Sequence, residues 1–195
     1  MKTKLKLVVS LACLSVLCLG ATACKDLTKD EDMAKKGYVI SVTYDPNGGK
    51  FMNREGVTIK DYFNPDVYQK ETDGSVQITL VEPTDASRPT SSLDKITLSR
   101  QNYTWVGWYQ ERNEVKNDDG EVVDIYGNVL EKKEDGSYVN ASSGKEASPA
   151  YTYSGRWDFE TQKLTYKAED YAETNGVMAL TLYAGWVPYY EFEYY

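Results

Sequence analysis

The side chains that could do chemistry in this 195-residue chain belong to few types. The sequence has no histidine, and its three cysteines, Cys13, Cys18 and Cys24, all lie within the first 24 residues. This composition excludes imidazole acid–base catalysis, Ser-His-Asp and Cys-His nucleophile pairs, and Cys/His zinc sites. A cofactor-free enzyme built from this chain would have to use carboxylates, Tyr, Lys or Arg.

The best candidate for a metal site is the oxygen-rich segment 117–121 (Asn-Asp-Asp-Gly-Glu), because calcium prefers such ligands. The ligand spacing of an EF-hand would require an oxygen at position 115, which is Val115. We therefore predict a solvated hairpin turn here, with no metal and no cofactor. The 30 acidic residues allow a carboxylate pair of the glycosidase type, but no pair lies in an apolar setting that would raise one pKa.

The thiol of Cys24 follows a segment typical of an export signal. Residues 1–23 run from three lysines through the apolar stretch 7–19 to the small residues Gly-Ala-Thr-Ala. Together with the cysteine, this segment resembles a bacterial lipoprotein signal, although the leucine usual three residues before the cysteine is Ala21 here. The resemblance implies that Cys24 is the lipid attachment residue of a mature chain that begins there. An ordinary secreted protein and an uncleaved anchor are the alternatives.

The charge of the mature chain limits its partners. Removing the three lysines of the signal from the 22 basic residues leaves 19, against 30 acidic residues, a net charge of −11. Such a chain is a poor partner for nucleic acid or anionic lipid, and the apolar stretch is too short for a transmembrane helix, so the lipid is the expected membrane anchor.

Residues 24–37 are expected to form a flexible tether, because they hold too few large apolar side chains to order themselves. Their acidic run resembles the surface-export signal of lipoproteins in Bacteroides-like bacteria. That resemblance implies a lipid-anchored protein on the outer membrane of a Gram-negative cell, facing outward. A plain spacer is the alternative.

Beyond Cys24 the composition favours strands, because 17 Tyr, four Trp and four Phe provide most of the core-forming side chains. Alternating residues predict a strand over 38–44 with Tyr38, Ile40, Val42 and Tyr44 on one face. A tight turn at 45–49 should end it, with Asn47 and Gly48 at positive φ. Further strands are expected at 75–81, 96–98, 103–109 and 178–186, and short helical turns around 64–70 and 166–173.

The segment 110–156 is predicted to be an insertion, because it is polar and rich in turn dipeptides, with one small hairpin around 122–126. The run 188–195 alternates as a strand. It either pairs back on the sheet or begins a further domain.

Three separated segments together resemble the internalin-type B-repeat, also called the Listeria-Bacteroides repeat: 42–49 (VTYDPNGG), 103–109 (YTWVGWY) and 180–186 (LTLYAGW). The likeness covers residues 38–187, roughly twice the usual repeat length. It implies a mainly β or α+β fold with a small β-grasp-like sheet and long insertions. It carries no catalytic residues. The positions assigned to this structural motif are Asn47, Gly48, Gly49, Gly107, Trp108, Tyr183 and Trp186.

These motif residues are expected to build a core. Gly107 should leave room for an indole that lies across the strand, and Trp108 and Trp186 should fill the interior. The function expected is that of a non-catalytic surface lipoprotein acting as an adhesion, binding or spacer module. Its partner would be a host protein, an envelope protein or a polysaccharide. A glycan-binding lipoprotein and a carboxylate-based glycan hydrolase are the alternatives, since exposed Tyr and Trp rings suit sugars.

Overall fold

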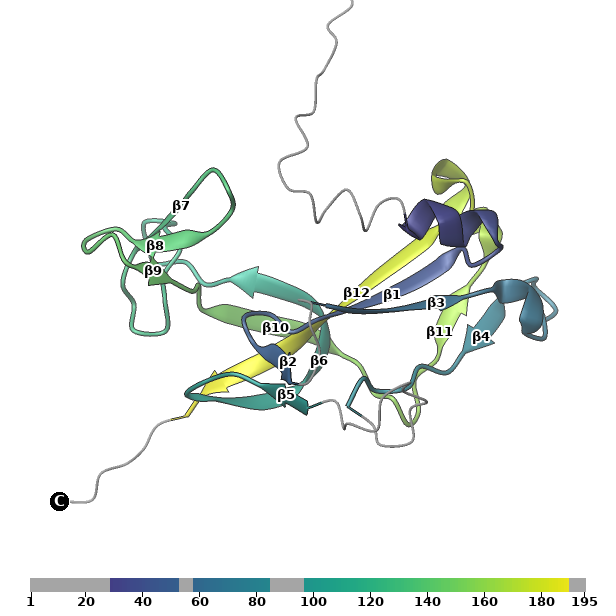
Figure 1. Cartoon of the computed structure of the whole chain (residues 1–195), viewed down its shortest axis with the longest axis horizontal. Coiled ribbons are helices and arrows are strands. Elements are labelled where there is room, and N and C mark those ends of the chain that lie inside the picture. Colours follow the sequence, from purple (N-terminus) through teal and green to yellow (C-terminus); the bar gives the residue numbers. More distant parts are fainter. Residues whose placement is uncertain (1–28, 53–57, 85–96, 190–195) are drawn as a thin grey trace, which may run out of the picture.

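The computed structural model in Figure 1 describes residues 29–52, 58–84 and 97–189 of the chain. Cys24 and the greater part of the terminal run 188–195 lie outside the described residues, so the expectations about the lipid and the chain end stay predictions. Within the described residues, no helix has the length and apolar character needed to cross a bilayer.

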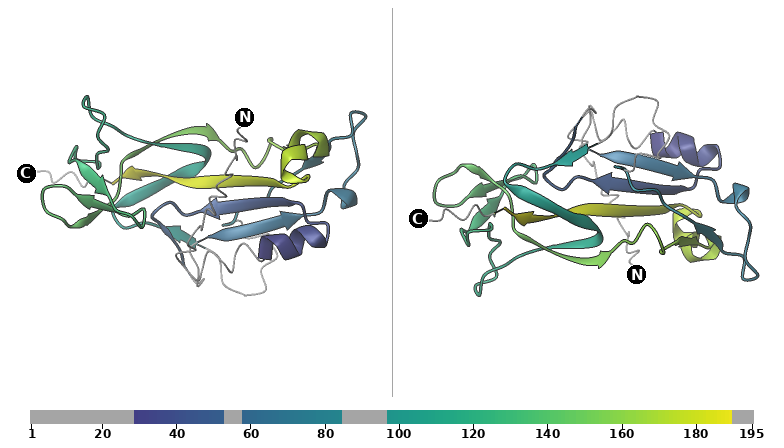
Figure 2. Two further views of the ribbon diagram at one scale, coloured as in Figure 1. Left: turned by 90° about the horizontal axis from the view of Figure 1, so that it is seen from above. Right: turned by 90° about the horizontal axis from the view of Figure 1, so that it is seen from below.

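A five-stranded mixed sheet in the order β10-β6-β12-β1-β3 forms the centre of the molecule (Figures 1 and 2). The first strand, β1 (Ile40–Asp45), lies parallel to the last, β12 (Met178–Pro188). Three antiparallel pairings complete the sheet: β3 (Ile59–Phe63) on β1, β6 (Tyr103–Glu114) on β12, and β10 (Tyr151–Arg156) on β6. A central parallel pair made by the first and last strands is the arrangement of a β-grasp-like sheet. The fold is therefore mainly β, of the α+β kind, as the sequence predicted.

Smaller elements surround this sheet. One two-stranded ribbon pairs β2 (Lys50–Met52) with β5 (Thr97–Ser99). A second pairs β4 (Val76–Ile78) with β11 (Leu164–Tyr166). A three-stranded sheet is formed by β7 (Leu130–Lys132), β8 (Tyr138–Asn140) and β9 (Glu146–Ala147). The 3-10 helices are η1 (Pro65–Val67) and η2 (Ala168–Thr174), and residues 29–35 are α-helical.

The hydrophobic core lies between the central sheet and the β4–β11 ribbon. Ile40, Val42 and Tyr44 of β1 are fully buried, as their alternation predicted, whereas Tyr38 is exposed. The apolar side chains of β4 and β11 belong to the same cluster. The β4–β11 ribbon therefore covers the face of the sheet that the alternation of residues in β1 had predicted to be apolar.

The turn after β1 confirms the prediction from the Asn-Gly pair. Asn47 and Gly48 both have positive φ, 48° and 80°, and the Gly49 amide donates to the Pro46 carbonyl at 2.9 Å. The short helical turn at η1 is also confirmed, because the Asn64 side chain caps it by accepting a hydrogen bond from the amide of Asp66.

The insertion is shorter than predicted at both ends. β6 runs on to Glu114 and β10 already begins at Tyr151, so both flanks of segment 110–156 belong to the main sheet. The Val115 amide donates to the Ala150 carbonyl at 2.9 Å, and this bond marks the base of an inserted lobe over residues 115–150. Instead of one hairpin near 122–126, the lobe holds β7, β8 and β9 (Figure 1). Its buried side chains lie outside the main core cluster and are Val123, Leu130, Tyr138 and Val139.

The predicted tether over 24–37 is ordered in its second half. Helix 29–35 lies beside the free edge of β3 (Figure 2), where Asp30 accepts hydrogen bonds from Lys60 Nζ at 2.8 Å and from the Tyr62 hydroxyl. Charged and polar contacts hold this helix in place. The sequence prediction weighed only its apolar content and therefore missed it.

Candidate functional site

The structure brings the first and last motif segments together at one end of the sheet. The Trp186 indole N–H donates to the Pro46 carbonyl at 2.9 Å, and the ring lies over Gly49, where a Cβ would stand 2.3 Å from its Cζ2. The side-chain amide nitrogen of Asn47, Nδ2, donates to the Ala184 carbonyl at 2.9 Å. These contacts join the β1 turn to β12, so the motif residues form a structural junction.

The side chain of Asn47 is fully engaged in this junction. It is only 3 % exposed, donates to the Tyr153 hydroxyl at 3.1 Å and accepts a hydrogen bond from Arg112. The Arg112 guanidinium in turn stacks over the Tyr183 ring, 4.5 Å from its centroid. Asn47 and Tyr183 therefore stabilise the fold and are not free to bind a ligand.

A β-bulge in β6 places two indoles on one face of the sheet. Trp105 pairs with Trp186 and Gly107 with Gly185, so Val106 is an extra residue that β12 does not match. Residues three apart on a regular strand point to opposite faces, but this bulge turns Trp105 and Trp108 to the same side, with ring centroids 6.5 Å apart.

Gly107 allows the bulge because its backbone adopts a positive φ. The sequence had instead predicted that this glycine makes room for an indole. Its φ is +134°, a conformation that favours glycine, and a Cβ there would lie 2.9 Å from Nε of Arg156. The side chain that crosses Gly107 is therefore arginine. The indole that crosses a glycine is that of Trp186, over Gly49.

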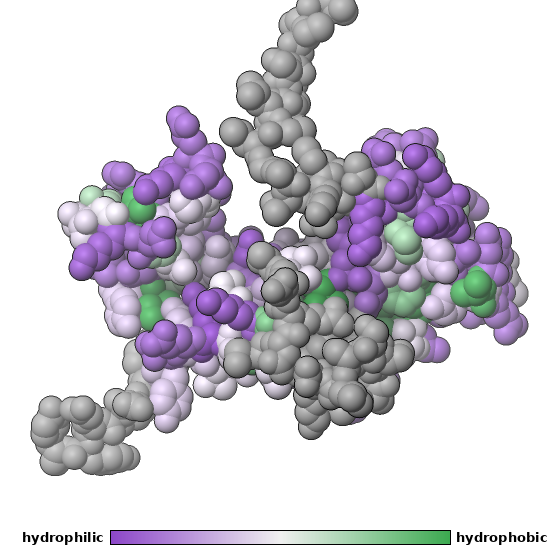
Figure 3. Space-filling view, viewed as in Figure 1, coloured by the Kyte–Doolittle hydropathy of each residue, from purple (hydrophilic) through white to green (hydrophobic). Residues whose placement is uncertain are grey.

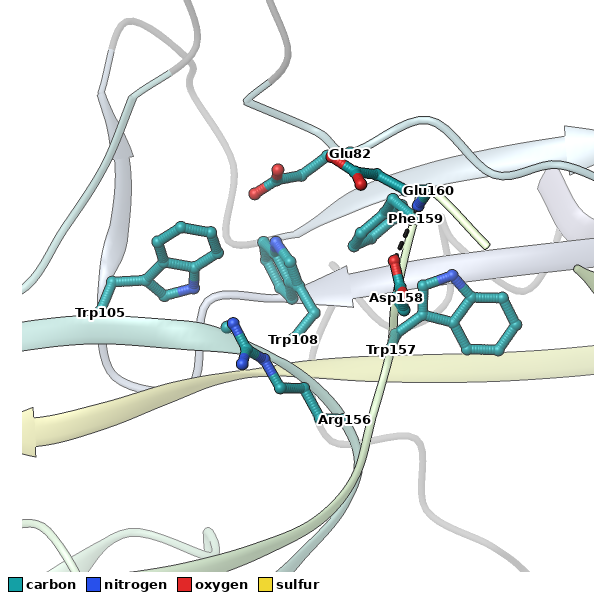
Figure 4. Close-up of a pocket in the computed structure, with 9 residues that line it drawn as sticks. Glu82, Trp105, Trp108, Arg156, Trp157, Asp158, Phe159 and Glu160 are labelled. Atoms are coloured by element: carbon teal, nitrogen blue, oxygen red, sulfur yellow. Dashed lines mark hydrogen bonds between the residues drawn. The ribbon is translucent and has the colours of Figure 1, made fainter. Parts of the chain in front are cut away.

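Beside this bulge lies a pocket of about 480 Å³, shown in Figure 4. Its aromatic wall combines the buried Trp108 and Trp157, 1 % and 6 % exposed, with the partly exposed Trp105 at 37 %. Trp105 and Trp108 come from β6, and Trp157 follows β10 directly. The remaining lining residues are Glu82, Gly107, Arg156, Asp158, Phe159 and Glu160.

The indole N–H groups of Trp108 and Trp157 are buried and have no hydrogen-bond partner within the described part of the chain. The comparable N–H of Trp186 does have one. Leaving a buried donor unpaired costs about 1–3 kcal/mol. In the view of Figure 4 the Trp108 nitrogen lies at the end of the ring nearest Glu82. Both nitrogens are enclosed by the protein and have almost no accessible surface, so in this structure the pocket does not expose them to a ligand.

The polar wall of the pocket is mainly acidic. Asp158 accepts hydrogen bonds from the Thr161 hydroxyl and from the Glu160 amide, and these bonds hold the pKa of Asp158 below its usual range. Glu82 accepts a hydrogen bond from the Thr84 hydroxyl at 3.0 Å. With Glu160 there are three carboxylates against the single guanidinium of Arg156. The site is suited to neutral, hydroxyl-rich ligands, because carboxylates accept and arginine donates.

The loop at 117–121 is the hairpin turn that the sequence predicted. The Asn117 side-chain oxygen accepts from the amides of Asp119 and Glu121, at 3.1 and 2.9 Å, so the loop binds its own backbone. No group of three acidic, histidine or cysteine side chains able to hold a metal occurs in residues 29–52, 58–84 and 97–189.

Sequence reasoning missed the pocket because its parts are far apart in the chain. The available signal was the Trp-Val-Gly-Trp run at 105–108, in which a glycine between two indoles indicates a bulge.

Comparisons of this chain with family models, with curated proteins and with solved structures found no match.

Proposed function

We propose that this protein is a non-catalytic surface lipoprotein that binds a neutral carbohydrate in the pocket beside Trp105. The observation that carries the proposal is the aromatic pocket itself, in which the partly exposed Trp105 ring lies beside the polar side chains of Glu82, Arg156 and Glu160. A pocket of this kind, apolar with a few convergent polar groups, is the usual form of a small-molecule site.

The chemistry of the pocket matches a sugar ring. The apolar face of a pyranose can lie against the exposed part of the Trp105 ring, as amphipathic aromatic side chains allow. Sugar oxygens can accept from Arg156, while sugar hydroxyls donate to Glu82 and Glu160.

Charge favours a neutral glycan over a sulfated or uronic acid polymer. The pocket carries more carboxylates than cations, and the mature chain has the net charge of −11 derived above. A polyanion would therefore be repelled at long range, and this repulsion would lower its association rate.

Asp158 is unsuited to the acid role of a carboxylate-based glycosidase. That role needs a carboxyl group that keeps its proton near neutral pH, and hydrogen bonds shift the pKa of Asp158 the opposite way. Lipidation at Cys24, exposure on an outer membrane and the likeness to B-repeats stay parts of this proposal and fit an adhesion role.

A protein partner is the alternative to a glycan. The molecular face in Figure 3 is mostly hydrophilic among the described residues, with small separate hydrophobic spots. Contiguous apolar patches mark many protein–protein sites, so this face favours the glycan.

The test is binding of the purified full-length protein, in mild detergent, to starch, dextran, xylan, mannan, laminarin and chondroitin sulfate. We expect at least one neutral polymer to bind and chondroitin sulfate not to bind. Trp105→Ala should lower the affinity about tenfold, within the range of buried aromatic contacts. Tyr38→Ala is the matched control, because Tyr38 has similar exposure and lies outside the pocket. Binding that survives Trp105→Ala unchanged, or release of new reducing ends, contradicts the proposal.

A further inference from the structure

A second, larger cleft of about 860 Å³ lies between the inserted lobe and the main sheet. One wall holds Arg100 from the turn before β6, Tyr103 at the start of β6 and Tyr189, which directly follows β12. The other wall comes from the lobe, with Asp124 and Tyr126. None of the residues that line the Trp105 pocket lines this cleft.

The lobe presents Tyr126 on a rigid turn. This ring is 78 % exposed, yet the backbone beneath it is fixed, because Asp124 Oδ1 accepts from the amides of Tyr126 and Asn128 at 2.8 and 2.9 Å. Desolvation of the carboxyl opposes the effect, but the hydrogen bonds from Asn128, Tyr126 and Gly127 lower the pKa of Asp124. The turn therefore stays formed at neutral pH and fixes the backbone that carries this exposed side chain.

The opposite wall presents a second tyrosine in the same manner. Tyr189 is 62 % exposed, and its amide donates to the Asn102 carbonyl at 2.8 Å. Next to it the Arg100 guanidinium stacks on the Tyr103 ring, 3.9 Å from the centroid. Both exposed tyrosines line the cleft, and a tyrosine has only two side-chain torsions to order when it binds, which is how tyrosines at binding surfaces contribute affinity.

The polar groups of the cleft are balanced in charge. Lys50 and Arg100 lie on the sheet wall, Asp124 and Glu146 on the lobe wall, and Asn102 adds an amide. Aromatic rings on both sides, with donors and acceptors between them, suit a hydroxyl-rich chain of no net charge.

The two sites lie close together along β6. Tyr103 pairs with Pro188 and Trp105 with Trp186, so Tyr103 and Trp105 are two residues apart on one face of the strand. Two residues of a strand span about 6.6 Å. A glycan of several units is long enough to occupy the Trp105 pocket and continue along this face.

We propose that the cleft between Tyr126 and Tyr189 is a second subsite for the same carbohydrate chain, so that the protein selects extended neutral glycans over mono- and disaccharides. This inference rests on the function proposed above. Two linked contacts bind more tightly than one because the second forms at a high effective concentration.

The experiment uses fragments of one to six units cut from the neutral polysaccharide that binds most tightly in the panel above. Affinities are measured by calorimetry for the full-length wild type, Tyr126→Ala, Tyr189→Ala and the control Tyr38→Ala. We expect both cleft variants to lose about tenfold in affinity for the six-unit fragment and to keep the wild-type affinity for one and two units. Trp105→Ala should weaken every length.

Equal affinity of wild type and both cleft variants at every length would overturn the inference and leave the proposed function intact. A loss that is the same for short and long fragments would overturn it too, as would a loss confined to one of the two tyrosines. If no polysaccharide of the panel binds the wild type, the proposed function fails first and the second subsite fails with it.

Discussion

Three of the four tryptophans line one pocket, and the fourth, Trp186, closes the junction with Gly49. What separates them is the partner of the indole N–H: Trp186 donates to Pro46, whereas the nitrogens of Trp108 and Trp157 have no acceptor among the described residues. The buried tryptophans therefore all pack in the interior, but only Trp186 also satisfies its N–H group there.

Truncating Trp108 to Ala should cost about 3–5 kcal/mol of unfolding free energy, the range for a large buried aromatic side chain. The ring contacts Tyr44 edge to face at 5.5 Å and stacks on Phe51 at 6.1 Å, so its removal leaves a cavity. Trp105→Ala is the matched comparison and should cost about 1 kcal/mol or less, since that ring is partly exposed. Chemical denaturation measures both, and equal losses would contradict the difference in role.

Local chemistry in the sequence was enough to predict the turn at Asn47 and the cap at Asn64, because each depends on a few adjacent residues. Local chemistry was not enough to predict that Trp105 and Trp108 lie on the same face of the sheet. Strict alternation assigns residues three apart to opposite faces, and only the positive φ of Gly107 within a bulge reverses this.

At the scale of elements, strands with one buried face were predictable and edge strands were not. β1, β4 and β12 carry buried apolar side chains at alternate positions. β1 and β12 were predicted close to their bounds, whereas β4 covers only 76–78 of the predicted 75–81. β3 and β10 are edge strands whose sequences are largely polar or aromatic, IKDYF and YTYSGR, and neither was predicted. An edge strand forms because its backbone pairs with a neighbouring strand, and hydrophobic periodicity in the sequence does not indicate such pairing.

Replacing residues 116–149 by a short Gly-Ser turn should leave the main domain folded. The lobe has its own buried cluster, and the ladder between β6 and β10 stays complete below it. Changing loop length carries only a small entropic cost. We expect one cooperative thermal transition in circular dichroism and retained affinity for short glycan fragments.

Failure of that variant to fold would show that the lobe stabilises the sheet. Retained affinity for the six-unit fragment would show that Tyr126 and its wall do not contribute to binding.

For the whole molecule, the lowered pKa values of turn carboxylates predict a loss of stability in acid. Asp73 and Asp135 accept hydrogen bonds first from the side chains of Ser75 and Ser137 and then from their amides, which lowers both pKa values. A depressed folded-state pKa means that this stabilisation is complete above the unfolded pKa, near 3.8. It is lost as pH falls through the folded value.

Because the chain has no histidine, we expect an almost constant melting temperature between pH 8 and 5 and a fall below about pH 4. The variant Asp73→Asn with Asp135→Asn keeps an acceptor in each turn but cannot titrate there. Its melting temperature should fall less steeply in acid, and an unchanged slope would show that other groups dominate.

The order of the central sheet was not predicted from the sequence. The motif segments marked the first and last strands without placing them side by side, and in the structure β1 and β12 are parallel neighbours. The pairing of β4 with β11 joins residues about 88 positions apart, such as Gln77 and Thr165, and nothing local encodes it. The pocket is likewise built from residues far apart in the sequence, since Glu82 lines it together with residues of β6 and of the segment after β10.

The proposed membrane anchoring of the molecule depends on Cys24. If its thiol is acylated, Cys24→Ala should abolish palmitate labelling and leave the precursor uncut or released from the membrane. A single acyl chain binds a bilayer only marginally, and stable anchoring needs a second chain or another contact, so we expect more than one acyl group at this terminus.

Membrane fractionation of labelled cells measures the outcome, and Cys18→Ala, within the signal, is the matched control. Labelling that persists in Cys24→Ala, or is lost equally in Cys18→Ala, would contradict anchoring through Cys24. A glycan-binding protein held only by its sugar contacts would then leave the cell surface whenever a free oligosaccharide competed for the Trp105 pocket.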